Sequence, residues 1–291
     1  MIFRLCFINC LLLLITVYST TMAGAMFEEY GYSFTSFIFL IMNPWALKSG
    51  LPFSFWLILI LGLHEMGHYW ACSRYGVAAT FPFFLPGPTI FGTFGAVIKI
   101  RGIIPHRNAL FDIGMAGPLA GFLASIPALI IGLSQATVSD IPIQEGTVLF
   151  GDSILISLLD TLFFLRGGEV ALNVNSIFYA GWVGLLATTM NLFPVGQLDG
   201  GHICYAISRR FHRVISYVTI FAIATLIMYS LIMRGFSVWV LWFAILIVMR
   251  ARHPRLLDEE VPLTAGRRWF SIISLAILLL SFMPDPISIQ P

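Results

Sequence analysis

The sequence predicts an all-α polytopic membrane protein with about seven transmembrane helices and one short membrane-associated β segment. Of its 291 residues, 58% are hydrophobic and only 10% are charged, and the mean hydropathy is +0.91. Soluble domains carry about 25% charged residues, so this chain has too few charges to cover a soluble core. The composition therefore excludes an ordinary soluble domain, a disordered chain and a nucleic-acid-binding protein.

Apolar runs predict the helices, because roughly 20 residues are needed to cross about 30 Å of hydrocarbon. The runs are 5–24, 51–73, 109–133, 176–207, 213–233, 236–249 and 269–284. The 176–207 run is interrupted, and the last two are short. A further run, 34–47, contains Pro44 and has a length typical of an interfacial or re-entrant segment.

The first run also resembles a secretory signal. Arg4 precedes an apolar core over 6–18, and Ala23-Gly24-Ala25 resembles a cleavage site. The apolar run continues to Met26 and is long enough to span a membrane, so we expect a retained helix rather than a cleaved leader.

The placement of Lys and Arg predicts the orientation through the positive-inside rule. With 34–47 not spanning and Met1 in the cytoplasm, Arg4 and the basic connections 74–108, 209–213 and 250–268 fall on the cytoplasmic side. Only Lys48, Arg166 and Arg234 then fall on the other side. This bias favours seven spans with the N-terminus inside and the C-terminus outside.

The connection 74–108 predicts the β segment, near 90–101. Residues 81–88 are rich in Phe, Pro and Gly, which break helices, and 93–100 alternate as a strand does. We expect this apolar connection to lie at the membrane beside a functional site, although a plain linker is the alternative.

We expect these elements to form one integral membrane domain over 1–291. Its N-terminal span and interfacial segment cover 1–50, its core helices 51–207, and its C-terminal helices 208–291.

The second predicted span carries His64-Glu65-Met66-Gly67-His68. Helical residues at i and i+4 share a face, so both imidazoles can bind one metal while Glu65 reaches a metal-bound water. Ionisable side chains inside a span are costly and usually functional. Polar packing between helices is the alternative.

Catalytic zinc takes three protein ligands and a water, so a third ligand is needed. Asp199 lies where Pro and Gly interrupt a helix, which is tolerated only in a protein-lined or wet cavity. His64 and Asp199 each lie ten residues before a basic boundary, and so at a similar depth of about 15 Å. We therefore predict a His64, His68, Asp199 site with one open position, and expect Asp112 to be a helix cap instead.

Five motifs are informative together: His64-Glu65-Met66-Gly67-His68, Gly114–Gly121, Asn191-x-x-Pro194-x-x-x-Leu198-Asp199-Gly200, Gly92-Thr93-Phe94-Gly95 and Arg252-His253-Pro254. Through these motifs the chain resembles the site-2 protease family of intramembrane zinc metalloproteases, as a minimal core member without a PDZ or CBS domain. The glycines of the second motif share one helix face and permit close helix approach.

The resemblance implies one Zn²⁺ held by His64, His68 and Asp199, with Glu65 as the catalytic acid/base. It implies cleavage of membrane proteins within or near a transmembrane helix, and a site opening toward the cytoplasm. Asn191 is a candidate donor to the substrate or intermediate, with helix packing as the alternative. The expected location is a bacterial or archaeal cell membrane, or a plastid membrane.

Two other functions fit a buried His/Asp cluster. An ion- or proton-coupled transporter is one, but transporters usually show internal repeats, and none is visible here. A catalytically silent membrane scaffold is the other, and the intact Glu65 argues against it.

Overall fold

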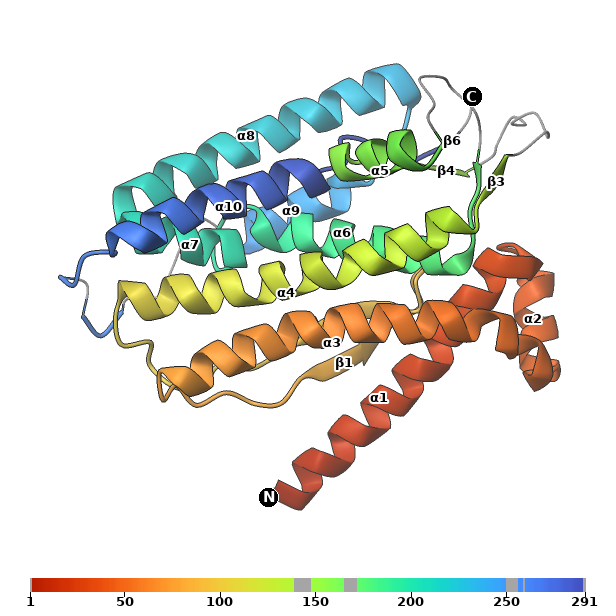
Figure 1. Ribbon diagram of the computed structural model, residues 1–291, viewed down its shortest axis with the longest axis horizontal. Coiled ribbons are helices and arrows are strands. Elements are labelled where there is room, and N and C mark those ends of the chain that lie inside the picture. The colour runs from red at the N-terminus through yellow and green to blue at the C-terminus, as the bar shows by residue number, and fades with distance from the viewer. Residues whose placement is uncertain (1, 139–147, 165–171, 250–255, 259, 290–291) are drawn as a thin grey trace.

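Most of the predicted apolar runs form helices that lie along one direction in the computed structural model (Figure 1). The structure describes residues 2–138, 148–164, 172–249, 256–258 and 260–289. The Arg252-His253-Pro254 motif lies outside the described residues. The longer helices are α1 (Ile2–Ala25), α3 (Leu51–Arg74), α4 (Arg107–Ser134), α6 (Ser176–Leu192), α8 (Arg209–Arg234) and α10 (Ala265–Ser281). The shorter ones are α2 (Phe34–Met42), α5 (Ile154–Phe164), α7 (Asp199–Ile207) and α9 (Trp239–Met249).

Four described helical segments are long and apolar enough to cross a membrane. They are Phe7–Tyr30, Pro44–Arg74, Arg107–Ser134 and Arg209–Arg234. The helices α6, α7, α9 and α10 have 17 residues or fewer each. The chain is therefore a mostly helical membrane protein with four candidate spans, and the count of seven stays a prediction.

The 34–47 run does not form one helix. It contains α2 and the start of a 3₁₀ helix, Pro44–Gly50, separated at Asn43. Pro44 lacks an amide hydrogen and ends the α-helical ladder there. The 3₁₀ turn then leads directly into α3.

The end of α1, which resembles a cleavage site, is packed against the entry to α3. Ala23 and Ala25 are buried. A Cβ added to Gly50 would lie 1.8 Å from the Thr21 carbonyl oxygen, so only glycine permits this helix crossing.

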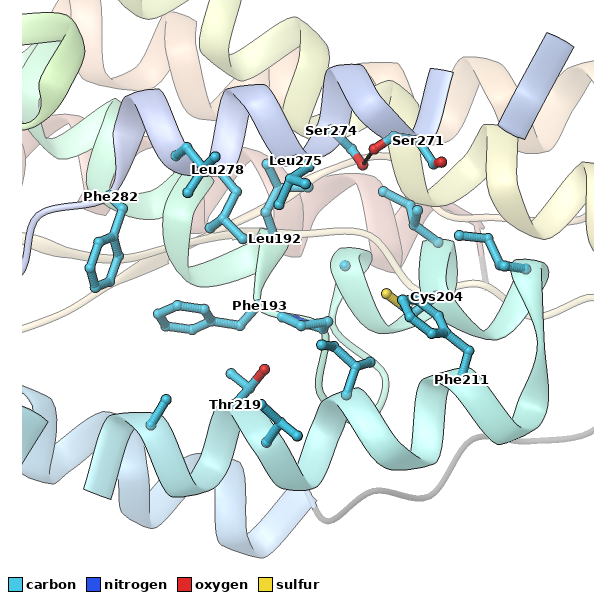
Figure 2. A pocket seen from close by; sticks show the side chains of 18 of the residues that line it. Leu192, Phe193, Cys204, Phe211, Thr219, Ser271, Ser274, Leu275, Leu278 and Phe282 are labelled. Atoms are coloured by element: carbon cyan, nitrogen blue, oxygen red, sulfur yellow. Dashed lines mark hydrogen bonds between the residues drawn. The ribbon is translucent and has the colours of Figure 1, made fainter. Parts of the chain in front are cut away.

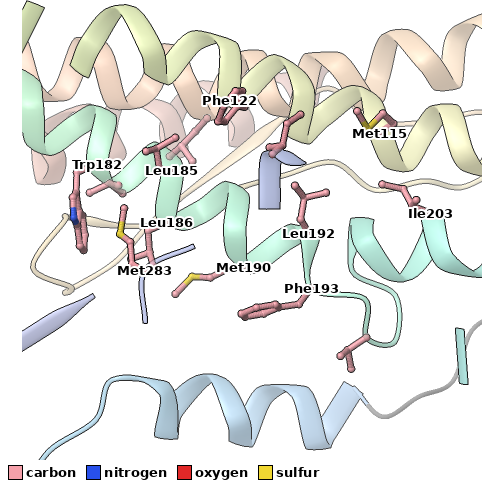
Figure 3. Packing of buried hydrophobic residues seen from close by; sticks show 14 of the residues in the cluster. Met115, Phe122, Trp182, Leu185, Leu186, Met190, Leu192, Phe193, Ile203 and Met283 are labelled. Carbon is pink, nitrogen blue, oxygen red and sulfur yellow. The ribbon is translucent and has the colours of Figure 1, made fainter. Parts of the chain in front are cut away.

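The core lies where α4 packs along both α3 and α6. Figure 3 shows Phe122 of α4 and Leu185 of α6 where the two helices meet, Leu186 on the other side of α6 near Met283, and Trp182 at one end of the same cluster. The Trp182 indole is fully buried, and its Nε1–H donates to the Gly151 carbonyl at 2.7 Å. This polar contact satisfies the one hydrogen-bonding group of an otherwise apolar side chain.

Part of the predicted 93–100 strand is β2 (Thr93–Val97), which pairs antiparallel with β1 (Phe83–Pro86). The sequence did not predict β1, because its Pro and Phe content resembles a loop. It also did not predict α5 or two small sheets, which pair β3 (Thr137–Val138) with β5 (Leu172–Asn173) and β4 (Val148–Phe150) with β6 (Ile287–Ile289). Such short strands carry little local signal, since their partners lie far away in the chain.

The expectation that Asp112 caps a helix was wrong. The N-cap of α4 is His106, whose Nδ1 accepts the Ala109 amide at 3.1 Å. Asp112 instead accepts two hydrogen bonds of 2.7 Å from the Arg267 guanidinium and one from the Tyr75 hydroxyl. A bidentate guanidinium is a stronger partner for a carboxylate than the helix dipole, and it ties the start of α10 to α3 and α4.

Basic residues mark one end of the bundle. Arg74 closes α3, Arg107 opens α4, Arg209 opens α8, and Arg267 lies in the first turn of α10. These helix ends lie together, on the left in Figure 1. The grouping is the one that the positive-inside rule requires. Which compartment this end faces stays a prediction.

Candidate metal centre

The helix α3 presents both histidines of the HExxH motif on one buried face. His64 and His68 are 5% and 6% exposed, and their Nε2 atoms lie 3.2 Å apart. The i, i+4 spacing places the rings one above the other along the helix. Two imidazole nitrogens this close suit a shared cation.

A backbone carbonyl of α4 orients one of these rings. The Nδ1 of His68 lies 2.7 Å from the Ile113 carbonyl oxygen. A carbonyl only accepts, so Nδ1 carries the proton and Nε2 keeps its lone pair. A hydrogen bond from the distal ring nitrogen is the usual way in which proteins orient a metal-binding histidine.

Asp199 reaches the same point from another part of the chain. Helix α6 ends at Leu192, the chain turns through 193–198, and α7 begins at Asp199. The Oδ2 of Asp199 lies 3.3 Å from Nε2 of His64 and 3.2 Å from Nε2 of His68. The structure therefore brings together the three predicted ligands.

The turn between α6 and α7 needs glycine. Gly196 has a φ of +57°, which side chains other than glycine rarely adopt. A Cβ on Gly200 would lie 1.9 Å from the Leu192 carbonyl oxygen. The helix break that the sequence indicated is thus the feature that places Asp199.

The three donor atoms fit a tetrahedral zinc ion. Their separations are 3.2, 3.2 and 3.3 Å. Ligand bonds of 2.0–2.1 Å give a tetrahedron with edges of about 3.3–3.4 Å. The donor set, two imidazoles and a carboxylate, also matches zinc chemistry, and it leaves one position for water.

Glu65 lies beside this triangle and outside it. Its Oε1 is 4.0 Å from Nε2 of His64, farther than Asp199, and its side chain is buried. Its Oε2 accepts the backbone amide of Ile98, just after β2, at 2.8 Å. Sequence reasoning did not find the Ile98 amide. The strand pattern over 93–100 predicted a strand beside the site, but it could not specify which amide faces Glu65.

The glycines of α4 make room for the imidazoles. A Cβ on Gly117 would lie 2.1 Å from Nε2 of His68, and one on Gly121 would lie 2.9 Å from Nδ1 of His64. The sequence predicted close approach of this helix face to a neighbour. The structure places that approach at the metal-binding rings.

Asn191, in the last turn of α6, lies at the edge of the site. Its Nδ2 is 3.4 Å from Nε2 of His64. The side chain is close enough to meet a group bound at the metal, and its role stays a prediction.

The sequence is similar to those of known peptidases. The profile of peptidase family M50 matches residues 52–235. The probable zinc metalloprotease EGY1, chloroplastic, of Arabidopsis thaliana is 30% identical over 244 residues, which cover 82% of this chain and 43% of that protein. The probable zinc metalloprotease EGY2, chloroplastic, of the same plant is 32% identical over 242 residues, covering 82% and 41%. The chain thus spans less than half the length of these curated relatives.

Proposed function

The chain belongs to peptidase family M50, the site-2 protease family, and from that premise we propose that it is an intramembrane zinc endopeptidase. It would cleave membrane proteins within or near a transmembrane helix. The observation that carries this proposal is the triangle of His64, His68 and Asp199 donor atoms, which has the edge lengths of a zinc tetrahedron.

In this proposal His64, His68 and Asp199 hold one Zn²⁺. A bound zinc ion would supply Lewis-acid activation of a water molecule and of the peptide carbonyl. The two histidines are buried and Asp199 is largely shielded from solvent, which supports the role because electrostatic interactions are stronger where water is excluded.

Glu65 is the proposed acid/base. It would take a proton from the attacking water on its Oε1 and deliver that proton to the departing amine. The Ile98 amide engages Oε2, so it leaves Oε1 directed toward the histidines. This contact would keep the carboxylate in one orientation through both proton transfers.

The edge of β2 is the proposed docking place for the substrate backbone. The Thr80 amide donates to the Lys99 carbonyl, which places Lys99 on the β1 side. Backbone groups alternate along a strand, so Ile98 and Ala96 point to the opposite edge, where Glu65 lies. An unwound substrate segment could pair there and present its carbonyl to the site.

Asn191 is proposed as a hydrogen-bond donor to the bound substrate. Its amide lies at the rim of the site, 3.4 Å from His64. A pure packing role is the alternative. The donor role predicts that replacing Asn191 lowers cleavage without lowering zinc content, and the packing role does not.

The proposed location is an integral membrane one, with the site nearer the basic end of the bundle, which would face the cytoplasm or an equivalent compartment. The relatives named above are chloroplastic by name, which supports the plastid membrane among the proposed locations. A bacterial or archaeal cell membrane is the alternative. The proposed partners are the lipid bilayer and substrates that contain a transmembrane helix.

Cleavage of a single-span substrate by the full chain in lipid vesicles tests the function, with zinc measured on the same samples. Glu65→Gln should keep its zinc and lose about 10²–10⁴-fold in rate. Asp199→Ala should lose both zinc and cleavage, and Asn191→Ala should lose cleavage alone. Glu29→Gln, on an exposed glutamate, is the matched control and should behave as wild type.

Two results would contradict the proposal. One is cleavage that survives in Glu65→Gln, and the other is full zinc content in Asp199→Ala. A transporter or a silent scaffold predicts instead that the wild-type chain binds metal and cleaves nothing.

A further inference from the structure

A cavity of about 680 Å³ lies between α8 and α10, against α7 and the segment that precedes it. We refer to it as the α8–α10 cavity. Figure 2 shows Leu275 of α10, and Phe282 just after it, across from Thr219 and Phe211 of α8, with Phe193 and Cys204 between them. Its walls are almost entirely apolar side chains. Gly200, the residue after Asp199, also lines it.

The serine hydroxyls in the wall are already bonded to their own helix. Ser271 Oγ donates to the Arg268 carbonyl at 2.6 Å, and Ser274 Oγ donates to the Ser271 carbonyl at 2.7 Å. An unwound peptide would need partners for its own amides and carbonyls, and these hydroxyls do not offer their protons. A hydrocarbon chain needs no such partners.

The length of the cavity matches one leaflet of a bilayer. Along α10 and its C-cap the lining residues run from Ser271 to Phe282, a rise of about 16 Å at 1.5 Å per residue. Half of a hydrocarbon core of about 30 Å is about 15 Å. An acyl chain of the leaflet at one end would therefore extend along most of the cavity.

The charges at one end favour an anionic headgroup. Phe211 and Ser271 lie at the same end in Figure 2, where α8 and α10 both begin. Arg268 is exposed and lies three and seven residues before Ser271 and Leu275, so it continues the lining face of α10. Arg210 is exposed and precedes Phe211 in the first turn of α8. Both helix N-termini add positive potential there.

We propose that the α8–α10 cavity binds one acyl chain of an anionic glycerophospholipid, with the phosphate near Arg268 and Arg210. Basic sites between transmembrane helices are a known setting for such headgroups. The bound chain would pack against Phe193 and Gly200, and so support the segment that carries Asp199. This proposal concerns binding and holds whether or not the chain is a protease.

Photo-crosslinking tests the proposal on the full chain in phosphatidylcholine vesicles. The probes are phosphatidylglycerol and phosphatidylcholine, each with a diazirine in the middle of one acyl chain, and adducts are mapped by mass spectrometry. We expect adducts on lining residues, with the anionic probe favoured roughly five-fold per contacting arginine. Arg268→Gln should lower that preference about five-fold. Arg213→Gln should not, because residue 213 lies two residues from Phe211 and so on the other side of α8.

Filling the cavity should abolish its labelling. Ala222→Phe and Leu275→Trp both enlarge lining residues, so two independent variants are available should one fail to fold. Ala224→Phe is the matched control, because Ala224 is on the same helix and does not line the cavity. Unchanged elution and zinc content identify the folded variants.

Three results would overturn the proposal. The first is equal labelling by the two probes, and the second is unchanged labelling in a folded Ala222→Phe or Leu275→Trp variant. The third is preferential labelling by a crosslinker on a transmembrane peptide that displaces the lipid probe, which would make the cavity a helix-docking site.

Discussion

Replacing Gly117 with alanine should expel zinc although no ligand is replaced. The new Cβ would lie 2.1, 2.4 and 2.5 Å from Nε2, Cε1 and Cδ2 of His68. Ordinary contact begins at 3.4 Å, so ring and methyl group must separate by about 1.3 Å. Metal sites tolerate distance errors of about 0.2 Å. We therefore expect zinc affinity to fall by at least about 100-fold, since changes in merely supporting residues already cost 10–100-fold.

Competition with a fluorescent zinc chelator on purified protein measures this affinity. The zinc affinity of Gly121→Ala should lie between those of the wild type and Gly117→Ala. Its Cβ would approach Nδ1 of His64 to 2.9 Å, a misfit of about 0.5 Å. Gly62→Ala is the matched control on α3, two residues before His64. Its Cβ would lie 3.4 Å from the Phe84 ring, an ordinary contact, and zinc affinity should not change.

Wild-type zinc affinity in a folded Gly117→Ala variant would refute this reasoning. It would mean that α4 can shift away from α3 at little energetic cost, contrary to the close packing of the two helices. Thermal unfolding of the zinc-free proteins separates the local effect from general destabilisation, since overpacking alone costs about 1–3 kcal/mol.

Two further predictions concern the substrate edge and the orientation. Ala96→Pro removes the Ala96 amide hydrogen, which lies on the same edge of β2 as the Ile98 amide, so it should raise KM for a helical substrate several-fold while zinc content stays the same. Ala96→Val keeps the amide and should leave KM near the wild-type value. Equal KM values in the two variants would contradict strand pairing. In a chain whose four native cysteines are replaced by serine, cysteines introduced by Arg101→Cys and by Gly235→Cys should react with an impermeant maleimide from opposite sides of sealed vesicles. Position 101 should react from the cytoplasmic side, and labelling of both positions from one side would exclude the proposed topology.

Much of the candidate site was predictable because its signals are local. The i, i+4 spacing of His64 and His68 determines their shared face in any helix. The Pro and Gly residues around Asp199 predicted a helix break near the depth of His64, and the structure has that break between α6 and α7. The apolar runs likewise predicted the long helices, since the length of hydrocarbon to be crossed sets the length of the run.

Apart from the approach of Asp199 to the two histidines, contacts between segments distant in the chain could not be predicted. The sequence suggested that Asp112 caps a helix. Its actual partner, Arg267, lies 155 residues away, so the sequence around Asp112 contained no sign of the ion pair. It indicated a strand near 93–100 without showing that the Ile98 amide meets Glu65, or that β1 would be its partner.

The sequence alone determined the chemistry of this protein: an apolar chain, two histidines and a glutamate on one helical face, and an aspartate at a helix break. Only the tertiary structure decided that Asp199 closes a triangle of 3.2–3.3 Å with the histidines, and that glycines of α4 give them room. The reason is that helical periodicity acts over four residues, whereas the register between helices depends on the packing of every side chain along their contact.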